Sequence, residues 1–368
     1  MLLKPATRQI FVDLHYESKA CSRLKNDNCD DEFLLSRILF LTTYDTNIDI
    51  EALIDRHHLA EIITQNLARH AAHYAEKTKK LQDDPMEGMA LVETLKLLFN
   101  ISHFCPQRSQ AFTPAIPHIL TILGKRQIIP SKPLEAPFGP LINSLINLDL
   151  KDAEAMHALF PKVDPTFNTA RFVDLLDLAI RLYKEDELDQ QVSPLLILMR
   201  KLYEIAPTDV QSYMKTLLLP SDSDRKQPLG RTETLSSRLL RLSTSPLAPQ
   251  SREGISSLLF EMSDKDARKF VQNVGYGFAS GFLFQHNVPV PENALDAFST
   301  TGSDGGSSST LREKQINPIT GQAVDFELKF EGPEMTKAEK EREAERLMVL
   351  FERYVPTVTS LTSAALTQ

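Results

Sequence analysis

The sequence predicts an all-α protein built as a helical-repeat array, or α-solenoid. From residue 33 to residue 285, leucine-rich stretches carry apolar residues at i, i+3, i+4 and i+7. Short segments with Pro, Ser, Asp or Gly separate these stretches, as expected for turns between helices. No alternating apolar run with a tight Asn-Gly or Asp-Gly turn is found, so strands are not predicted.

The spacing of similar segments indicates the type of repeat. Asn100 and Asn147 lie in the related contexts Leu-Phe-Asn-Ile and Leu-Ile-Asn-Leu, 47 residues apart. Leu195 and Leu235 begin comparable apolar stripes 40 residues apart. Both intervals are typical of HEAT and armadillo units, which stack because one unit cannot bury its apolar face alone. We therefore expect an armadillo/HEAT-type superhelix with a concave binding surface.

Individual helices follow from apolar stripes and capping residues. One stripe comprises Phe172, Leu175, Leu176, Ala179 and Leu182, and the next comprises Leu195, Leu198, Met199, Leu202 and Ile205. Ser193 is the predicted N-cap of the second helix, because Pro194 suits the first helical position. The same rules predict an N-cap at Thr232, a capping box formed by Ser263 and Asp266, and a helix stop at Gly275.

Composition divides the chain into four parts. The repeat array is expected over 1–287, with an exposed loop at 221–231. A flexible linker rich in Ser, Gly and Pro is expected over 288–334, because it lacks the apolar side chains needed to offset its ordering entropy. An amphipathic C-terminal helix at 335–355 and a disordered tail at 356–368 follow. The helix docks either on its own array or on a partner, and the sequence leaves both alternatives open.

Charge and cysteine usage exclude several classes of protein. The formal net charge is -8 and no long basic run occurs, which disfavours a nucleic-acid partner. The sequence has three unevenly spaced cysteines, Cys21, Cys29 and Cys105. Their number and spacing indicate a reducing, cytoplasmic compartment rather than a disulfide framework. No apolar run reaches the about 20 residues that a membrane helix needs, so direct membrane insertion is not expected.

The sequence lacks the common signatures of catalysis and metal binding. The sequence contains no phosphate-binding loop, no His-Glu-x-x-His and no Gly-x-Ser-x-Gly, so we expect neither an enzyme nor a cofactor. His57, His58, His70 and His73 cluster in the sequence. A zinc site would need a thiolate pair with ligand spacing, so these residues are interpreted as surface histidines and no metal is expected.

Three asparagines and three arginines are the candidate binding residues. Asn100, Asn143 and Asn147 either hold the backbone of a bound peptide, which a carboxamide does as donor and acceptor, or bridge neighbouring helices. Arg37 lies in an apolar run and needs an anionic partner, either an internal carboxylate or an incoming C-terminal carboxylate. Two further arginines stand beside the Leu235 stripe and are by default solvated charges: Arg238 and Arg241.

Several segments, taken in order, resemble the synembryn family. They cover almost the whole chain and comprise residues 37–42 (Arg-Ile-Leu-Phe-Leu-Thr), 91–101, 274–283 (Val-Gly-Tyr-Gly-Phe-Ala-Ser-Gly-Phe-Leu), 316–321 (Ile-Asn-Pro-Ile-Thr-Gly) and 335–341 leading into 347–351. The resemblance, to a fungal-like member, implies a guanine nucleotide exchange factor and folding chaperone for heterotrimeric G-protein α subunits (Gα). It implies action by binding, without covalent chemistry.

The resemblance also implies how Gα, GDP-bound or nucleotide-free, is held. The concave face would grip the Gα C-terminal helix through Arg37, Asn100, Asn143, Asn147, Arg238 and Arg241, and the C-terminal helix would contact Gα through Leu347, Leu350 and Phe351. In the family, the linker carries acidic-directed phosphorylation sites. Here the linker is less acidic, and Thr301 and Thr310 are the acceptors at 299–310 with an acidic residue three positions on. We expect a cytoplasmic monomer that reaches the cell cortex through Gα.

The N-terminal sequence departs from the family pattern. Residues 1–5 (Met-Leu-Leu-Lys-Pro) resemble the end of a repeat helix, and family members extend further upstream. We therefore expect an array without its first repeats, with exposed leucines, reduced solubility and weakened Gα affinity. The competing hypothesis is an armadillo-type adaptor that binds an extended peptide and has no exchange activity. An enzyme would need a convergent polar cluster that the sequence does not display.

Overall fold

The structure is a computed structural model that describes residues 4–76, 84–289, 316–317 and 319–327, together with residues 336, 339, 342, 343 and 346. The chain divides into two compact units, Met1–Phe326 and Glu327–Gln368. The first unit contains the helices α1 to α16. Its described residues form helices, with one isolated antiparallel bridge between Ile316 and Ala323 and no strand. The all-α prediction is therefore confirmed.

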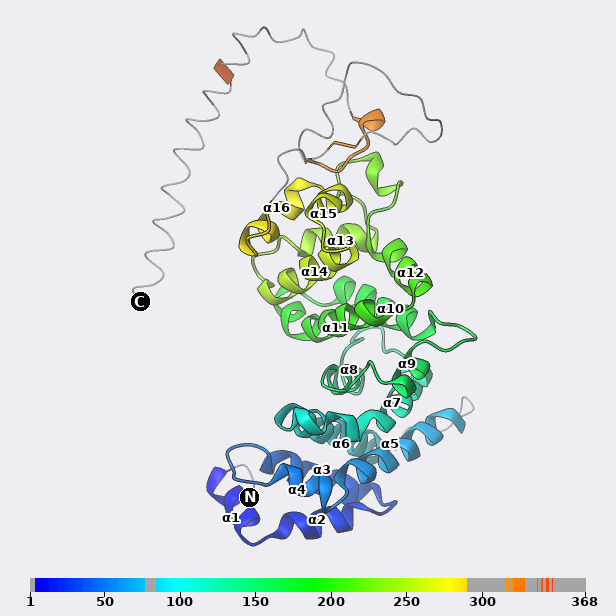
Figure 1. Cartoon of the computed structure of the whole chain (residues 1–368), viewed down its shortest axis with the longest axis vertical. Helices are drawn as coiled ribbons and strands as arrows, with labels where there is room; N and C mark the ends of the chain where they lie inside the picture. Colours follow the sequence, from blue (N-terminus) through cyan, green and yellow to red (C-terminus); the bar gives the residue numbers. More distant parts are fainter. Residues whose placement is uncertain are drawn as a thin grey trace, which may run out of the picture. The chain divides into compact units, whose positions relative to one another are not determined.

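Five helices form one layer of the array, which we call the ladder layer. Each packs against the next, so that the layer grows by one helix per repeat (Figure 1). In chain order these helices are α3 (Cys29–Thr42), α6 (Pro85–Phe104), α8 (Phe138–Ile146), α11 (Glu185–Ile205) and α14 (Pro249–Met262). This stacking of neighbours is the arrangement of an α-solenoid.

A second layer, the cover layer, packs against one side of the ladder layer. It comprises α2 (Tyr16–Leu24), α4 (Ile50–Asp55), α5 (Leu59–Glu76), η1 (Pro106–Ala115), α7 (Ile116–Lys125), α9 (Ala153–Leu159), α10 (Phe167–Leu182), α12 (Thr208–Leu218), α13 (Leu235–Leu242) and α15 (Ala267–Val274). At the two ends of the array, α1 (Pro5–Asp13) packs on α2 and α3, and α16 (Tyr276–Gln285) packs on α14 and α15.

The apolar core lies between these layers. Phe172, Leu175, Leu176 and Ala179 of the predicted stripe are all buried, whereas Leu182 at the end of α10 is 48% exposed. The stripe predicted for α11 is also buried up to Leu202. Each such side chain contributes about 1.5–3 kcal/mol to folding, which outweighs the weak intrinsic stability of single helices.

The predicted start of α11 at Ser193 is wrong. The helix begins at Glu185 and continues through Pro194, although proline removes one helical hydrogen bond. Leu188 and Val192, which precede the proline, are buried in the core. Packing on both sides of Pro194 therefore outweighs the local cost, and the Ser193 hydroxyl donates to the carbonyl of Asp189 at 2.5 Å instead of capping.

Two other predicted caps are shifted by two or three residues. Thr234, not Thr232, caps α13, and its hydroxyl accepts from the amide of Ser237. Asp266 alone caps α15 by accepting from the amide of Lys269 at 2.8 Å, while Ser263 follows the end of α14. The predicted stop at Gly275 is confirmed, because α15 ends there with φ +81°.

Residues 221–231 form a loop that is mostly exposed, as composition predicts, but two buried charged side chains anchor it. Asp224 is 3% exposed, and Arg225 beside it is also buried. The Asp224 carboxylate accepts hydrogen bonds from the amide and hydroxyl of Ser221 and from three hydroxyls near the start of α13: Thr232, Thr234 and Ser236. These bonds hold the turn η2 (Asp224–Lys226) against α13.

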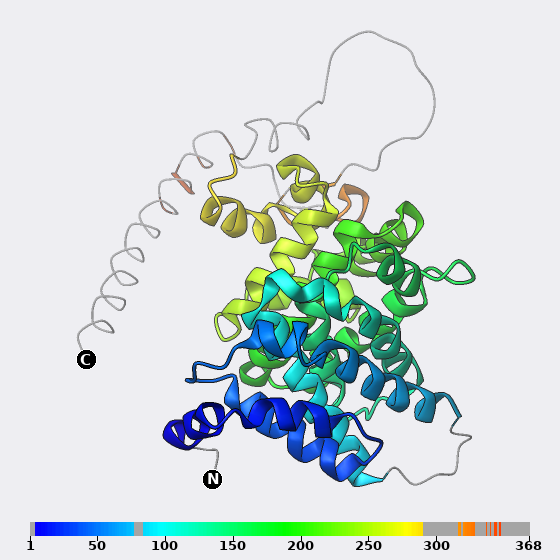
Figure 2. The same cartoon turned by 60° about the horizontal axis from the view of Figure 1, so that its bottom comes forward.

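Part of the predicted linker is ordered against the same end of the array. We call residues 316–317 and 319–326 the tail clip; they turn back on themselves and end in η3 (Val324–Phe326). The Leu229 amide donates to the carbonyl of Thr320 at 3.0 Å, and the Gly277 amide donates to that of Ile319 at 3.2 Å. Both views place η3 beside this end (Figures 1 and 2). The prediction of a linker without structure therefore fails for these residues.

The remaining expectations for the C-terminal region cannot be compared with the structure. Thr301, Thr310, Leu347, Leu350 and Phe351 all lie outside the described residues, as does the tail at 356–368. Among the helices that are described, none is both long and apolar enough to span a membrane.

The Asp224 site generates a testable prediction. Burial alone would raise the pKa of Asp224, but hydrogen bonds from Thr234 and Ser221 outweigh it and lower the pKa to about 2. Because this value lies below that of an unfolded aspartate, the ionised carboxylate stabilises the fold above about pH 4. This stabilisation, about 2 kcal/mol, should disappear as the pH falls from about 4 to about 2.

The measurement is urea unfolding of wild-type protein and the variant Asp224→Ala between about pH 2 and about pH 7. At pH 7 the free energy of unfolding of the variant should be about 2–4 kcal/mol lower than that of wild type, because several buried donors lose their acceptor. The control is Asp174→Ala, an exposed carboxylate on α10 whose removal should change stability by less than about 0.5 kcal/mol. Equal stability of Asp224→Ala and wild type would contradict the prediction.

Candidate functional site

The side of the ladder layer that the cover layer leaves open is the candidate site. Each ladder helix packs against a helix before it, a helix after it and the cover layer, so one stripe of side chains remains exposed. We call this surface the ladder face. Its exposed or half-buried residues are Arg37, Met89, Val92, Lys96, Asn143, Ile197, Arg200, Gln250, Glu253 and Ser257.

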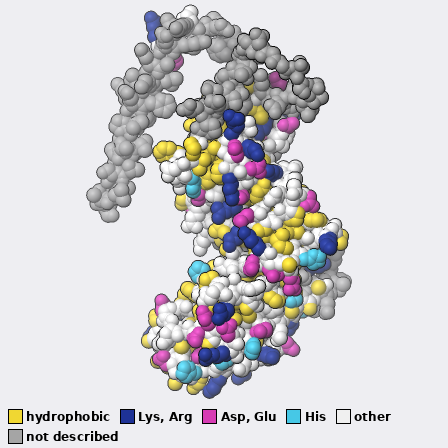
Figure 3. Space-filling view, viewed as in Figure 1, with side chains coloured by type: hydrophobic (Ala, Val, Ile, Leu, Met, Phe, Trp, Pro, Cys, Tyr) yellow, Lys and Arg dark blue, Asp and Glu magenta, His cyan; other side chains and the backbone are white. Residues whose placement is uncertain are grey.

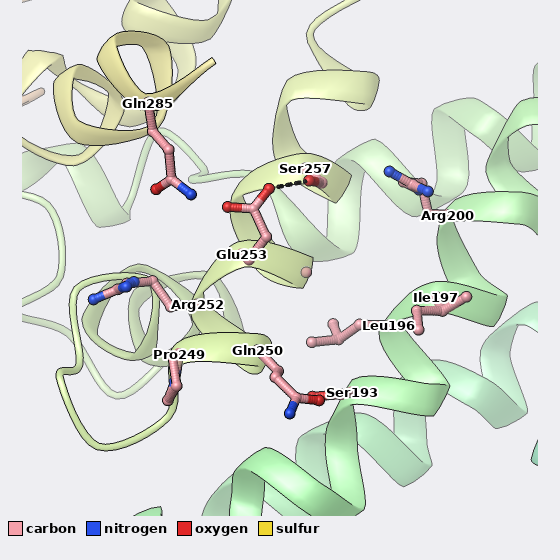
Figure 4. Close-up of a pocket in the computed structure, with 11 residues that line it drawn as sticks. Ser193, Leu196, Ile197, Arg200, Pro249, Gln250, Arg252, Glu253, Ser257 and Gln285 are labelled. Carbon is pink, nitrogen blue, oxygen red and sulfur yellow. Dashed lines mark hydrogen bonds between the residues drawn. The ribbon is translucent and has the colours of Figure 1, made fainter.

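A hollow of about 480 Å³ lies on the ladder face between α11, α14 and α16. Figure 4 shows that side chains of α11 and α14 border it together with Gln285 of α16. Glu253 accepts from the hydroxyl of Ser257 at 3.1 Å and lies 2.8 Å from the ring nitrogen Nε2 of His286. Arg200 and Arg252 line the hollow and make no ion pair with the described residues, so both guanidinium groups are available to an anionic ligand.

A second hollow, of about 400 Å³, lies between α3, α6 and the segment that precedes α8. Arg37 lines it, and its Nη1 atom lies 3.4 Å from Oε1 of Glu93. The internal-carboxylate interpretation of Arg37 is therefore supported, although Glu93 is shared with Lys96 at 2.9 Å. The Arg37 side chain is 50% exposed, so its remaining donors still face the hollow.

The three asparagines have different environments. Asn100 is buried, donates to the hydroxyl of Thr43 at 2.8 Å and accepts from that of Tyr44 at 3.2 Å, so it bridges α6 to the end of α3. Asn147 donates to the carbonyl of Phe99 at 3.3 Å and bridges α8 to α6. The helix-bridging alternative therefore holds for both. Asn143 is half-buried, and its side chain has no hydrogen bond within the described chain, so it remains a candidate ligand contact.

Arg238 and Arg241 are not on the ladder face, which corrects their predicted location. Both belong to α13, a helix of the cover layer. Arg238 is 14% exposed and pairs with Asp177 of α10. Arg241 donates to the carbonyl groups of Gly230 and Thr232 at 2.9 and 2.8 Å. These arginines hold α13 and its preceding segment in place, a role that helical spacing does not reveal.

Sequence analysis missed a buried polar cluster that joins α3, α5 and α6. Glu32 is fully buried, and its carboxylate accepts from the Thr94 hydroxyl at 2.6 Å and lies 3.1 Å from Nε2 of His70. Burial would raise the pKa of Glu32, but hydrogen bonds from His70 and Thr94 hold it below its usual value. The interpretation of His70 as a surface histidine is therefore wrong; the sequence offers no signal, because its partners are distant in the chain.

The histidines and cysteines show no arrangement for metal binding or nucleophilic chemistry in the described residues. His57 and His58 line a separate hollow beside α2, and His73 lies 2.8 Å from Glu87. Cys21, Cys29 and Cys105 form no disulfide. Burial raises the pKa of the Cys21 thiol to about 12, so this group is protonated and unreactive at neutral pH.

The side chains of the ladder face suit an amphipathic partner, with one polar and one apolar side, rather than a small reactive substrate. Met89 of α6 and Ile197 of α11 are exposed apolar side chains on two ladder helices that are separated by α8. In Figure 3, Lys and Arg side chains gather on the visible surface over the region of α11, α14 and α15. Apolar side chains interspersed with unpaired cations match an amphipathic segment that carries negative charge.

The two asparagine environments generate a second prediction. Asn100→Ala should lower the free energy of unfolding by about 1–3 kcal/mol, because the buried hydroxyl of Thr43 and the partly exposed hydroxyl of Tyr44 lose their partner. Asn143→Ala, with no such partner, is the matched control and should change it by less than about 0.5 kcal/mol. Chemical denaturation checks both, and equal effects would refute the assigned environments.

Comparison with known proteins gives the family. The profile for guanine nucleotide exchange factor synembryn matches residues 1–357. A synembryn-like chaperone of Schizosaccharomyces pombe is 27% identical over 344 residues, which are 89% of this chain and 62% of that protein. Chaperone Ric-8A of Macaca fascicularis is 25% identical over 337 residues, and that of Mus musculus is 23% identical over 335 residues; each match covers 88% of this chain.

These matches cover most of this chain but only part of each relative. The chain spans 62% of the length of the three curated relatives just described. The family profile nevertheless covers nearly the whole chain, from the first helix of the array to beyond the tail clip. On this evidence the chain belongs to the synembryn family.

Proposed function

We propose that this chain is a guanine nucleotide exchange factor and folding chaperone for Gα. In this proposal the ladder face binds the C-terminal helix of Gα and the complex stabilises the nucleotide-free state. The observation that supports it most is the family match over residues 1–357. The open ladder face, with its hollows and unpaired arginines, supports the proposed mode of binding.

The ladder face offers complementary groups for such a helix. Met89 and Ile197 would contact the apolar side of the helix, as in other helix-in-groove complexes. Arg200 and Arg252 would attract acidic side chains or a terminal carboxylate, for which a guanidinium fork is well suited. Asn143 would donate to or accept from the ligand backbone.

Exchange would follow from differential affinity. The chain would bind Gα with an open nucleotide site better than Gα with bound nucleotide, so its binding promotes GDP release. By reciprocity, GTP binding would weaken the complex and release Gα. The same preference would protect an incompletely folded Gα, which is the chaperone activity. This mechanism requires no covalent step and no cofactor. The chain would act as a monomer in the cytoplasm and would reach the cell cortex when bound to Gα.

Two further features belong to the proposal. Leu347, Leu350 and Phe351 would form a second contact with Gα beyond the array, and their position in the chain follows the tail clip. Phosphorylation at Thr301 or Thr310 would add negative charge to the linker, which a basic surface of the array would attract.

A charge reversal on the ladder face tests the proposal. Arg200→Glu should weaken Gα binding about tenfold and slow GDP release, because it replaces an unpaired cation with an anion. Its free energy of unfolding should stay within about 0.5 kcal/mol of wild type, because the side chain is exposed. Lys162→Glu, an exposed lysine between α9 and α10, makes the same change of charge away from the ladder face and should leave both activities intact.

The wild-type assay decides between the proposal and the adaptor. It measures GDP release from purified Gα and then size-exclusion chromatography without nucleotide. Accelerated release, with a complex that dissociates on adding GTP, supports the proposal. An absence of both acceleration and complex would reject it and favour a peptide-binding adaptor.

A further inference from the structure

Arg225 holds the end of the array and the tail clip together. It is 8% exposed, and its guanidinium Nη2 donates to the carbonyl groups of Gln272 and Asn273 at 3.1 and 2.9 Å. These carbonyls belong to the last turn of α15, where helical partners are lacking. Its Nη1 donates to the carbonyl of Gly321 in the clip at 3.0 Å. The Arg225 side chain therefore joins a helix end to a segment that lies 96 residues after Arg225 in the sequence.

The backbone around Arg225 adds to the same contact. The Ala323 amide donates to the Arg225 carbonyl at 2.8 Å. The side-chain amide of Gln322 donates to the carbonyl of Lys226 at 3.2 Å. The clip thus pairs with η2 through its main chain, while the buried Asp224 network fixes η2 from the other side.

Glycines on both sides allow this close approach. A Cβ atom on Gly275 would lie 3.1 Å from the carbonyl oxygen of Ile319, and φ there is +81°. A Cβ atom on Gly321 would lie 2.3 Å from a methyl carbon of Leu229, and φ there is +67°. Both positions therefore require glycine, which indicates that the clip has one specific seat on the array.

The clip is also the last part of the chain that belongs to the array. The first compact unit ends at Phe326 and the second begins at Glu327, directly after the clip. A segment that leaves from a fixed point has a higher effective concentration at a nearby surface than one on a long free tether. The place where the clip is held therefore controls what the following residues can reach.

We propose that Arg225 is a positioning residue that, through the tail clip, fixes where the chain beyond residue 326 leaves the array and thereby strengthens the hold on Gα. This inference rests on the proposed function. It adds a residue that touches neither the ladder face nor Gα and acts through the path of the chain.

The experiment compares full-length variants that open the clip from opposite sides. Arg225→Met removes the guanidinium, and Gly321→Ala places a methyl group against Leu229 without altering Arg225. The control is Arg231→Met, which removes an exposed cation six residues further on that lacks a side-chain contact among the described residues. Hydrogen exchange at the amides of Gly277, Leu229 and Ala323 reports directly on the clip.

Binding is measured for whole Gα and for an isolated peptide of the Gα C-terminal helix. Both clip variants should lose protection at these amides and bind whole Gα about tenfold more weakly. Their affinity for the peptide should remain that of wild type, because the ladder face is unchanged. A purely structural role of Arg225 would instead lower affinity for the peptide and for whole Gα together.

The remaining outcomes separate the two proposals. Open clips with undiminished affinity for whole Gα would overturn the positioning role while leaving the proposed function intact. Clip amides that stay protected in Arg225→Met would also overturn the positioning role. If Arg225→Met does not fold, Gly321→Ala provides the same test. Absence of Gα binding by the wild-type chain would reject the proposed function, and the positioning role for Gα with it.

Discussion

The packing of each ladder helix against the next is the interaction on which the rest of the structure depends. Because α3, α6, α8, α11 and α14 each bury side chains against two neighbours and the cover layer, every repeat needs the repeats beside it. The free energy gained by packing against neighbouring repeats outweighs the helix-breaking preference of proline, as the continuous helix through Pro194 shows. The same packing leaves one side of each ladder helix open, and the ladder face is the sum of those open sides.

Buried polar groups fix the alignment of these helices. Glu32 joins α3 to α5 and α6, and Asn100 joins α6 to the end of α3. A buried carboxylate or carboxamide costs several kcal/mol unless its hydrogen bonds are satisfied, so only one arrangement of the helices is favourable. Apolar packing gives the array its stability, and these groups restrict how neighbouring helices can slide. The ladder face thus has defined distances between its arginines and hollows.

A rigid binding face and a separately anchored segment fit the exchange activity that we propose for this chain. A rigid face loses little entropy on binding, and differential affinity requires a surface that prefers one state of its partner. Asp224 and Arg225 stabilise the array end at which the clip is seated, so they connect the fold of the repeats to the path of the remaining chain. Under the proposed positioning role, stability and function would share residues at this end of the array.

The all-α class, the buried stripes and the stop at Gly275 could be predicted from the sequence, because they depend on spacing and on local backbone sterics. The family resemblance could be read from the sequence as well. The asparagines that bridge helices and the carbonyl groups that the Arg225 side chain reaches became evident from the folded chain. Those partners lie 47 to 96 residues apart in sequence, and no local pattern encodes a contact over such distances.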